Sequence, residues 1–403
     1  MGKSVLTICV GGILIGLCCL GNVEAQEESS IVERNPVIDM PVPVKKPLIQ
    51  MAILLDTSGS MSGLIDQAKA ELWAIVNEFI FARRQGQEPE LQVALFEYGK
   101  SSLARKDGYI RQIVALTTDL DKISEELFAL KTNGGDEYCG WVIREATKLL
   151  EWSSSPDDLK VIFIAGNEPF TQGPIDYRKS CKEAVSKGII VNTIHCGSQQ
   201  EGINGKWKDG CLLADGQYLN IDHNRRTVHI EAPQDKEIAE LSRKLNDTYV
   251  AYGRHGGQAL GRQAAQDKNA ARVSGEVAAQ RAMSKSSHYY NNSGWDLVDA
   301  FDEDESKLEK LKAEDLPEPM KKMSKKERKA YIEVKAKERG EVQKRIQELT
   351  EQRKKHVAQE MKKLNKDGKT LGSAIIKAIR KQAEMRNFKF ESAEKNSEKD
   401  ASK

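Results

Sequence analysis

The chain has 403 residues, and its 62 Lys and Arg residues nearly balance its 60 Asp and Glu residues, so the formal net charge is only +2 at pH 7. This length suits one large domain or two smaller ones. A charge so close to zero singles out no class of partner, and we expect none of the partners to be a nucleic acid.

The N-terminus resembles a signal peptide over residues 1–25. Lys3 is followed by an uncharged apolar run at 5–20, and Ala25 would place a small residue at the cleavage site. We therefore expect an exported protein, periplasmic or secreted. Because the apolar run is slightly long for a signal peptide, an uncleaved N-terminal membrane anchor is the alternative. Residues 26–46 show no regular period and are expected to form an extended linker.

Four cysteines would remain after removal of the leader: Cys139, Cys181, Cys196 and Cys211. An even number of cysteines in an exported chain favours disulfides. We predict that Cys196 pairs with Cys211, closing one loop, and that Cys139 pairs with Cys181, joining two helix starts. Four cysteines allow three pairings, and free buried thiols are the alternative.

Segments typical of strands and of helices alternate between residues 47 and 253. Apolar or alternating runs predict strands at 51–56, 91–98, 109–115, 160–165, 189–195 and 217–221. Helical periodicity lies between them, at 63–84, 120–130, 140–152, 176–186 and 235–246. This order predicts an α/β fold, a doubly wound and mostly parallel sheet with helices on both faces, followed by an α-helical C-terminal region.

Oxygen-bearing side chains follow the first strand, in the pattern Asp56-x-Ser58-x-Ser60. In a doubly wound sheet, ligands bind at the carboxyl ends of the strands, which puts Asp56, Asp136 and Asn167 on one rim. Carboxylates and hydroxyls suit hard cations, so this rim predicts a site for Mg²⁺ or Ca²⁺ rather than zinc.

The same pattern, Asp56-x-Ser58-x-Ser60, resembles the first motif of the metal-ion-dependent adhesion site (MIDAS) of the von Willebrand factor type A (VWA) family. The resemblance covers residues 47–253. It implies a Rossmann-like domain that binds another protein through a divalent cation held at the rim of the sheet.

The second and third loops of the site depart from the family pattern, in which a Thr and then an Asp are expected. Asp136 stands at the Thr position, and Gly166-Asn167-Glu168 lacks the Asp. If Asp136 and Glu168 both face inward, the cation would be held more tightly and would attract a partner carboxylate less. If the third loop stays neutral, a cation would bind weakly, or the loops would keep only a hydrogen-bonded structural role. We expect an altered metal site with the candidate ligands Asp56, Ser58, Ser60, Asp136, Asn167 and Glu168.

Residues 254–323 form an Ala- and Gln-rich segment that we expect to be partly helical. Its local group of aromatic residues includes Tyr289, Tyr290 and Trp295. We expect this group to dock onto the preceding domain, and an exposed recognition patch is the alternative.

Residues 324–390 are expected to form a helical hairpin or a weak coiled coil. A capping box at Ser324 opens a long helix whose sparse heptad seam is interrupted by Arg353. A shorter amphipathic helix at 371–379 would fold back on it as a hairpin partner. Residues 391–403 read as a disordered tail.

Enzymatic signatures are weak. A group of His and Cys residues has no compact zinc-site spacing, and the Asp-Thr-Ser-Gly-Ser segment lacks a Gly-x-Ser-x-Gly nucleophile elbow. The zinc candidates would be His195, Cys196, Cys211, His223 and His229.

We therefore expect a non-enzymatic exported module whose rim binds a protein, with or without a divalent cation, and whose helical arm mediates assembly or oligomerisation. The first alternative is a structural cell-envelope protein whose arm does the binding and whose rim is inert. A hydrolase or metal enzyme that uses the His and Cys residues is the second alternative.

Overall fold

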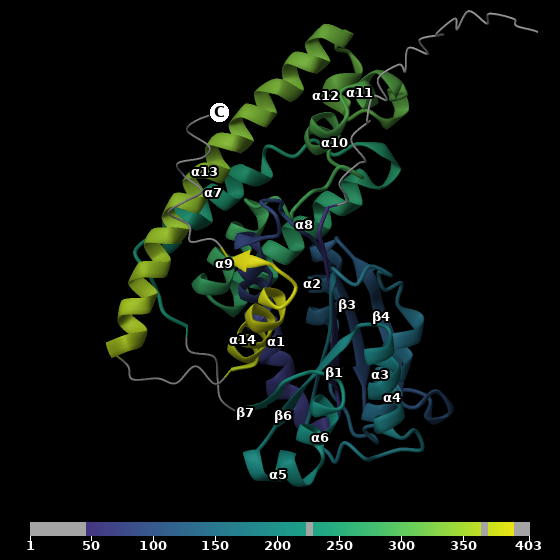
Figure 1. Ribbon diagram of the computed structural model, residues 1–403. Coiled ribbons are helices and arrows are strands. Elements are labelled where there is room, and N and C mark those ends of the chain that lie inside the picture. Colours follow the sequence, from purple (N-terminus) through teal and green to yellow (C-terminus); the bar gives the residue numbers. More distant parts are fainter. Residues whose placement is uncertain (1–45, 223–228, 364–369, 391–403) are drawn as a thin grey trace, which may run out of the picture. The chain divides into compact units, whose positions relative to one another are not determined.

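The computed structural model describes residues 46–222, 229–363 and 370–390 (Figure 1). All of them belong to one compact unit, Lys45–Lys403. The predicted signal peptide, nearly all of the predicted linker and the predicted tail lie outside the described residues. Within the three described stretches, no helix combines the length and the apolar character needed to cross a membrane.

A six-stranded sheet in the order β4-β3-β1-β5-β6-β7 forms the centre of this unit. Every neighbouring pair is parallel except β3 and β4, which are antiparallel. This arrangement confirms the predicted fold class. The strands are β1 (Leu48–Asp56), β3 (Glu90–Tyr98), β4 (Ile110–Thr117), β5 (Leu159–Gly166), β6 (Ile190–Cys196) and β7 (Tyr218–Ile221).

The central strands read as continuous apolar runs because both of their faces are covered. In β1, Met51 and Ile53 enter one core, whereas Ala52 and Leu54 enter the core on the other side. Helices α3 and α4 lie on one side of the sheet and α1 and α14 on the other (Figure 1). The helices of the sheet domain are α1 (Ser62–Glu78), α2 (Leu120–Ala129), α3 (Cys139–Leu149), α4 (Tyr177–Ser186), α5 (Gln199–Asn204), α6 (Trp207–Leu212) and α14 (Leu371–Glu384).

A helical module of residues 229–363 is inserted between the last strand of the sheet, β7, and the helix α14. Its longest helix, α13, packs along α7, α9 and α10. Its helices are α7 (Asp235–Asn246), α8 (Gly253–Val273), α9 (Gly275–Lys285), α10 (Leu297–Glu303), α11 (Ser306–Lys310), α12 (Glu318–Lys321) and α13 (Lys325–Lys363). Short 3-10 turns occur at η1 (Gly59–Met61), η2 (Phe79–Phe81), η3 (Arg105–Asp107) and η4 (Ala313–Asp315).

The buried seam of α13 alternates isoleucine and arginine at seven-residue intervals: Ile332, Arg339, Ile346 and Arg353. Arg353, which we expected to interrupt the seam, belongs to it. Its guanidinium reaches Asp235 Oδ1 at 2.6 Å and donates to the Ile230 carbonyl at 2.8 Å. The heptad pattern therefore serves contacts with helices of the same chain.

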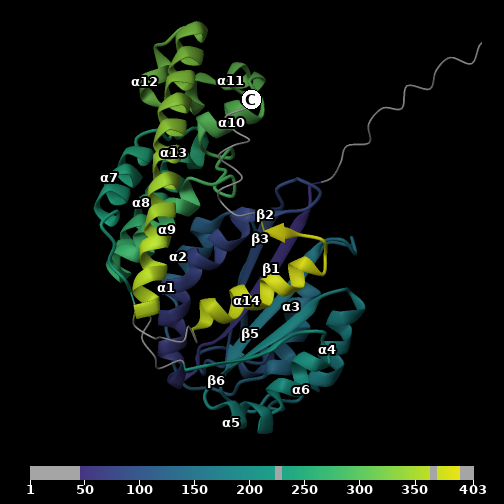
Figure 2. The same ribbon diagram turned by 60° about the vertical axis from the view of Figure 1, so that its left-hand side comes forward.

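Helix α14 does not pair with α13, and the predicted hairpin is wrong. It packs on α1 and on β5, β6 and β7, and Figure 2 shows it in yellow in front of the sheet. Its N-terminus is fixed by α1, because Glu71 Oε2 accepts from the Thr370 hydroxyl at 3.0 Å and from the Gly372 N–H. Beyond α14, the short strand β8 (Lys389–Phe390) pairs with β2 (Ala82–Arg83).

The expected docking of the aromatic segment is confirmed. Tyr289 enters the core of the sheet domain, and its hydroxyl donates to the Phe79 carbonyl at 2.8 Å. The Tyr290 hydroxyl donates to Asp121 Oδ2 of α2 at 2.6 Å. Both phenols thus satisfy their polar ends while burying their rings.

Candidate functional site

Asp56 is the last residue of β1, and its side chain is 0 % exposed. Its Oδ1 accepts a hydrogen bond of 2.7 Å from the Ser58 N–H. Its Oδ2 is buried and has no hydrogen-bond partner among the described residues. A charged oxygen in this position is costly unless a proton or a cation accompanies it.

Two glycines let neighbouring backbone approach the Asp56 carboxylate closely. Gly99 follows β3 with a φ of +79°, and a Cβ there would lie 2.8 Å from Asp56 Oδ1 and 2.8 Å from Glu137 Cγ. A Cβ on Gly166, at the end of β5, would lie 3.0 Å from Asp56 Oδ2. Side chains at either position would fill the space around the carboxylate.

Glu137 is the second acid of the site. Its side chain is 5 % exposed, and its backbone N–H donates to Gln172 Oε1 at 2.9 Å. Burial raises the pKa of Glu137 to about 8, and the nearby negative charges of Asp56 and Glu168 add to the rise.

Burial also raises the pKa of Asp56 to about 7. The negative charge of Glu168 contributes to the rise, whereas the Ser58 N–H and hydroxyl oppose it. The Asn167 backbone N–H also lowers this pKa, although it completes no hydrogen bond to the carboxylate. The two neighbouring carboxyl groups therefore both titrate close to neutral pH.

The predicted ligands take different positions. Ser58 is buried and its hydroxyl lowers the pKa of both carboxyl groups, whereas Ser60 is exposed on η1. Asp136 is exposed and accepts a hydrogen bond of 3.1 Å from the Tyr138 hydroxyl. The structure thus brings Glu137, which the sequence analysis missed, to Asp56 in place of Asp136.

The third loop contributes Asn167 and Glu168, both half-buried. Asn167 Oδ1 is a second buried oxygen without a hydrogen-bond partner among the described residues. Glu168 adds negative charge to the site, and its carbonyl accepts from Trp207 Nε1 at 2.8 Å.

Backbone hydrogen bonds fix the loops around Asp56. The Thr57 N–H donates to the Tyr98 carbonyl at 2.8 Å, and the Asn133 N–H donates to the Thr57 carbonyl at 3.1 Å. The Thr57 hydroxyl also donates to buried Glu97, which pairs with Arg111 at 2.7 Å. The protein's own contacts therefore hold the site in shape.

The oxygens gathered here fit a hard cation: Asp56 Oδ2, the Glu137 carboxylate, the Ser58 hydroxyl and Asn167 Oδ1. In the part of the chain that the structure describes, no three His, Cys, Asp or Glu side chains are grouped to hold a metal ion. A cation at this rim would therefore rely on hydroxyl, amide and water oxygens beside the two carboxylates.

The predicted disulfides are wrong, because Cys139, Cys181, Cys196 and Cys211 are all free and buried. Cys196 enters the core on the α1 side of the sheet. Cys211 lies on α6 beside Thr193, whose side chain bonds to the Trp207 carbonyl of α6. Burial raises the pKa of all four thiols. Of the zinc candidates, His223 lies outside the described residues, and His229 is 3.5 Å from Glu276.

No protein-family model matches the chain, and a search of curated proteins gave no match. Solved structures do match part of it. BatB of Bacteroides thetaiotaomicron, a conserved hypothetical protein, is 16% identical, with 43% of this chain and 90% of that chain covered and a TM-score of 0.34. The SpRpn10 VWA domain is also 16% identical, with 43% and 88% covered and a TM-score of 0.34. A mussel byssus protein, proximal thread matrix protein 1 with a zinc-occupied MIDAS motif, is 10% identical, with 43% and 42% covered and a TM-score of 0.31.

Proposed function

We infer that the chain contains a VWA-type domain, and we propose that the rim of its sheet binds another protein with the help of a divalent cation. The observation that carries the proposal is the buried Oδ2 of Asp56, which has no hydrogen-bond partner among the described residues. The other oxygen of this carboxylate, Oδ1, and the Glu137 side chain both lie against Gly99. The strand order and the Asp56-x-Ser58-x-Ser60 pattern support the family inference.

A cation would replace protons that the two acids otherwise hold. Without one, Asp56 and Glu137 titrate near pH 7 and pH 8, because burial disfavours their charged forms. A divalent ion between the two groups would lower both pKa values and satisfy the open oxygen. We propose Mg²⁺ or Ca²⁺, since the surrounding donors are oxygens.

Binding, rather than catalysis, is the role that we propose for this rim. The Ser58 hydroxyl lies against two carboxyl groups, so it can add a neutral oxygen ligand to a cation that they hold. Export of the protein remains part of the proposal, and the N-terminal residues that indicate it lie outside the described ones.

The rim is a better candidate for the partner surface than the seam of α13. That seam is occupied by contacts within the chain: Arg339 bonds to Asp296, and Arg353 bonds to Asp235. Assembly through the same seam would have to break both buried pairs. The cell-envelope alternative, in which the helical arm does the binding, would therefore need another face of α13.

The test is calorimetry of Mg²⁺, Ca²⁺ and Mn²⁺ binding to the full mature protein and to three variants. We expect Asp56→Asn and Glu137→Gln to lose at least one ion's binding heat, whereas Asp136→Asn, a neighbouring exposed acid, retains it. Wild-type protein that binds none of the three ions would refute the cation, and equal loss in Asp136→Asn would refute the site. Partner capture from extracts should follow the same pattern across the variants.

A further inference from the structure

A groove runs between α2 of the sheet domain and α8 of the helical module. It consists of two solvent-open cavities of about 600 and 420 Å³, which adjoin because Glu125 lines both. Volumes of this size are typical of ligand sites. Neither cavity is lined by Asp56, Glu137 or any other residue of the rim.

Positive side chains lie at both ends of the groove. Lys69 and Arg272 line the larger cavity, and Lys122 and Arg262 line the smaller one. Glu125 is the acid of the lining. The charge of the groove therefore favours an anionic ligand.

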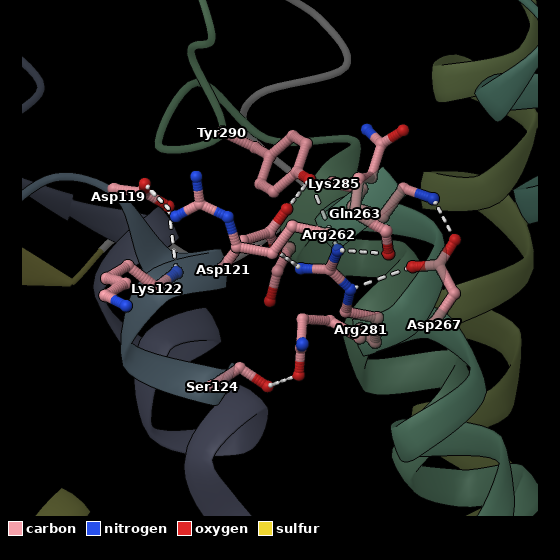
Figure 3. Close-up of polar contacts among 12 residues, drawn as sticks. Asp119, Asp121, Lys122, Ser124, Arg262, Gln263, Asp267, Arg281, Lys285 and Tyr290 are labelled. Atoms are coloured by element: carbon pink, nitrogen blue, oxygen red, sulfur yellow. Dashed lines mark hydrogen bonds and ion pairs between the residues drawn. The ribbon is translucent and has the colours of Figure 1, made fainter. Parts of the chain in front are cut away.

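The two ends differ in how their charges are neutralised. Arg262 pairs with Asp119 at 2.9 Å (Figure 3), and Lys122 pairs with Glu126 at 2.7 Å. Among the described residues, neither Lys69 nor Arg272 lies within ion-pair distance of a carboxylate. Lys69 rests on the ring of Phe128, 5.9 Å from its centroid. The larger cavity thus offers two cations that an incoming carboxylate could pair with.

The floor of the larger cavity carries a fixed amide. Gln266 is 2 % exposed, and its Oε1 accepts from the Ser124 hydroxyl at 2.9 Å and from Asn269 Nδ2 at 3.0 Å. Its amino group has no acceptor among the described residues and is therefore left to donate to a ligand. Such a donor suits a carbonyl or carboxylate oxygen.

A buried ionic network holds the walls of the groove together (Figure 3). Arg281 of α9 pairs with Asp121 of α2 at 2.5 Å and with Asp267 of α8 at 2.9 Å. Lys285 pairs with the same Asp267 at 2.8 Å. Because these groups are desolvated and mutually paired, α2 and α8 are fixed relative to each other.

The length of the groove indicates its occupant. Its lining on α8 extends from Gln258 to Val273, which is roughly 22 Å at ~1.5 Å per residue. An extended peptide of about six or seven residues spans this distance. We propose that the groove binds an extended acidic segment of a partner protein, whose carboxylates pair with Lys69 and Arg272 and whose backbone accepts from Gln266. This site is independent of the cation proposed for the rim.

The experiment is fluorescence anisotropy with a labelled Asp- and Glu-rich peptide of about eight residues, recorded in EDTA so that no cation at the rim contributes. We expect the double variant Lys69→Gln/Arg272→Gln to bind about tenfold more weakly. Ala265→Trp, which fills the smaller cavity, should also weaken binding. The matched control is Lys325→Gln/Lys326→Gln, which removes two exposed cations from α13, and it should bind as the wild type does.

Three results would overturn the proposal. Unchanged affinity in Lys69→Gln/Arg272→Gln would show that the groove is not the site. Equal loss in Lys325→Gln/Lys326→Gln would show diffuse attraction to a basic surface. Displacement by inorganic phosphate as effectively as by unlabelled peptide would show a small-anion site. Thermal melting of each variant checks that all of them are folded.

Discussion

Two buried acids lie together at the end of β1, and their titration links the pH to the stability of the fold. Burial raises the pKa of Asp56 to about 7 and that of Glu137 to about 8. The folded protein therefore binds these protons more tightly than the unfolded chain does. Their contribution to stability is complete below the ordinary carboxyl range and is lost as the pH rises through 7 and 8.

We predict that, in EDTA, the melting temperature of the protein falls as the pH rises from about 5 to about 8. The melting temperature should fall less steeply with pH in Asp56→Asn, because an amide replaces one of the titrating groups. Saturating Mg²⁺ or Ca²⁺ should reduce the slope in the wild type, since the cation stabilises the ionised acids. A wild-type slope identical to that of Asp56→Asn would contradict the assignment.

At the scale of single residues, the sequence could not predict which acid the second loop contributes to the site. The sequence analysis placed Asp136 in the site, whereas the structure places Glu137 beside Asp56, because the choice between two adjacent acids depends on how an irregular segment turns. The Glu137 N–H bond to Gln172 helps to set that turn, and Gln172 lies on a different loop. Asp56 and Ser58 were predictable because the end of a buried strand fixes their direction.

At the scale of elements, the sequence predicted the six strands of the central sheet and helices α1 to α4, because their periods are strong and they alternate. It missed the short helices α5 and α6, and it assigned α7 to the sheet domain, whereas α7 packs on α9 and α13 of the helical module. The amphipathic pattern of α14 also predicted a helix. Such a pattern indicates that one face of the helix is buried, but it does not indicate which other element covers that face. Glu71 and Gln67 of α1 bond to the start of α14, and that pairing joins residues about 300 positions apart in the chain.

We predict that the buried arginines of α13 stabilise the protein far more than its exposed ones. Arg339→Ala leaves Asp296 buried without its partner at 2.7 Å and should cost about 3–5 kcal/mol of unfolding free energy. Arg345→Ala, on the same helix α13, breaks exposed pairs with Glu237 of α7 and with Glu348, and it should leave the unfolding free energy nearly unchanged. Denaturant unfolding of both variants measures the difference, and equal costs would contradict the buried pairing.

At the scale of the whole molecule, α14 completes the sheet domain although it follows the helical module in sequence. Its Ile375 and Ile379 belong to the same core as β1 and α1. A truncation from Ser324, which would otherwise isolate the contribution of the helical arm, therefore also removes part of the sheet domain. Single substitutions at the rim or on α13 can instead separate the contributions of these two surfaces to partner binding.

We predict that a chain ending at Lys363 fails to fold natively, because the apolar face of α1 loses its cover. It should bind the dye ANS and lose near-ultraviolet circular dichroism. A chain ending at Phe390 retains α14 and β8 and serves as the control, which should behave as the full chain does. Native spectra for the chain ending at Lys363 would show that α14 is dispensable.

The position of α14 also sets an order of events during synthesis. A ribosome releases β1 to β7 first, then the entire helical module, and only afterwards the helix that closes the sheet. Until α14 is released, the apolar surface that it covers stays exposed to solvent and can aggregate with other chains. Folding of the sheet domain therefore finishes with α14, and the helical module must accommodate the return of the chain to the sheet.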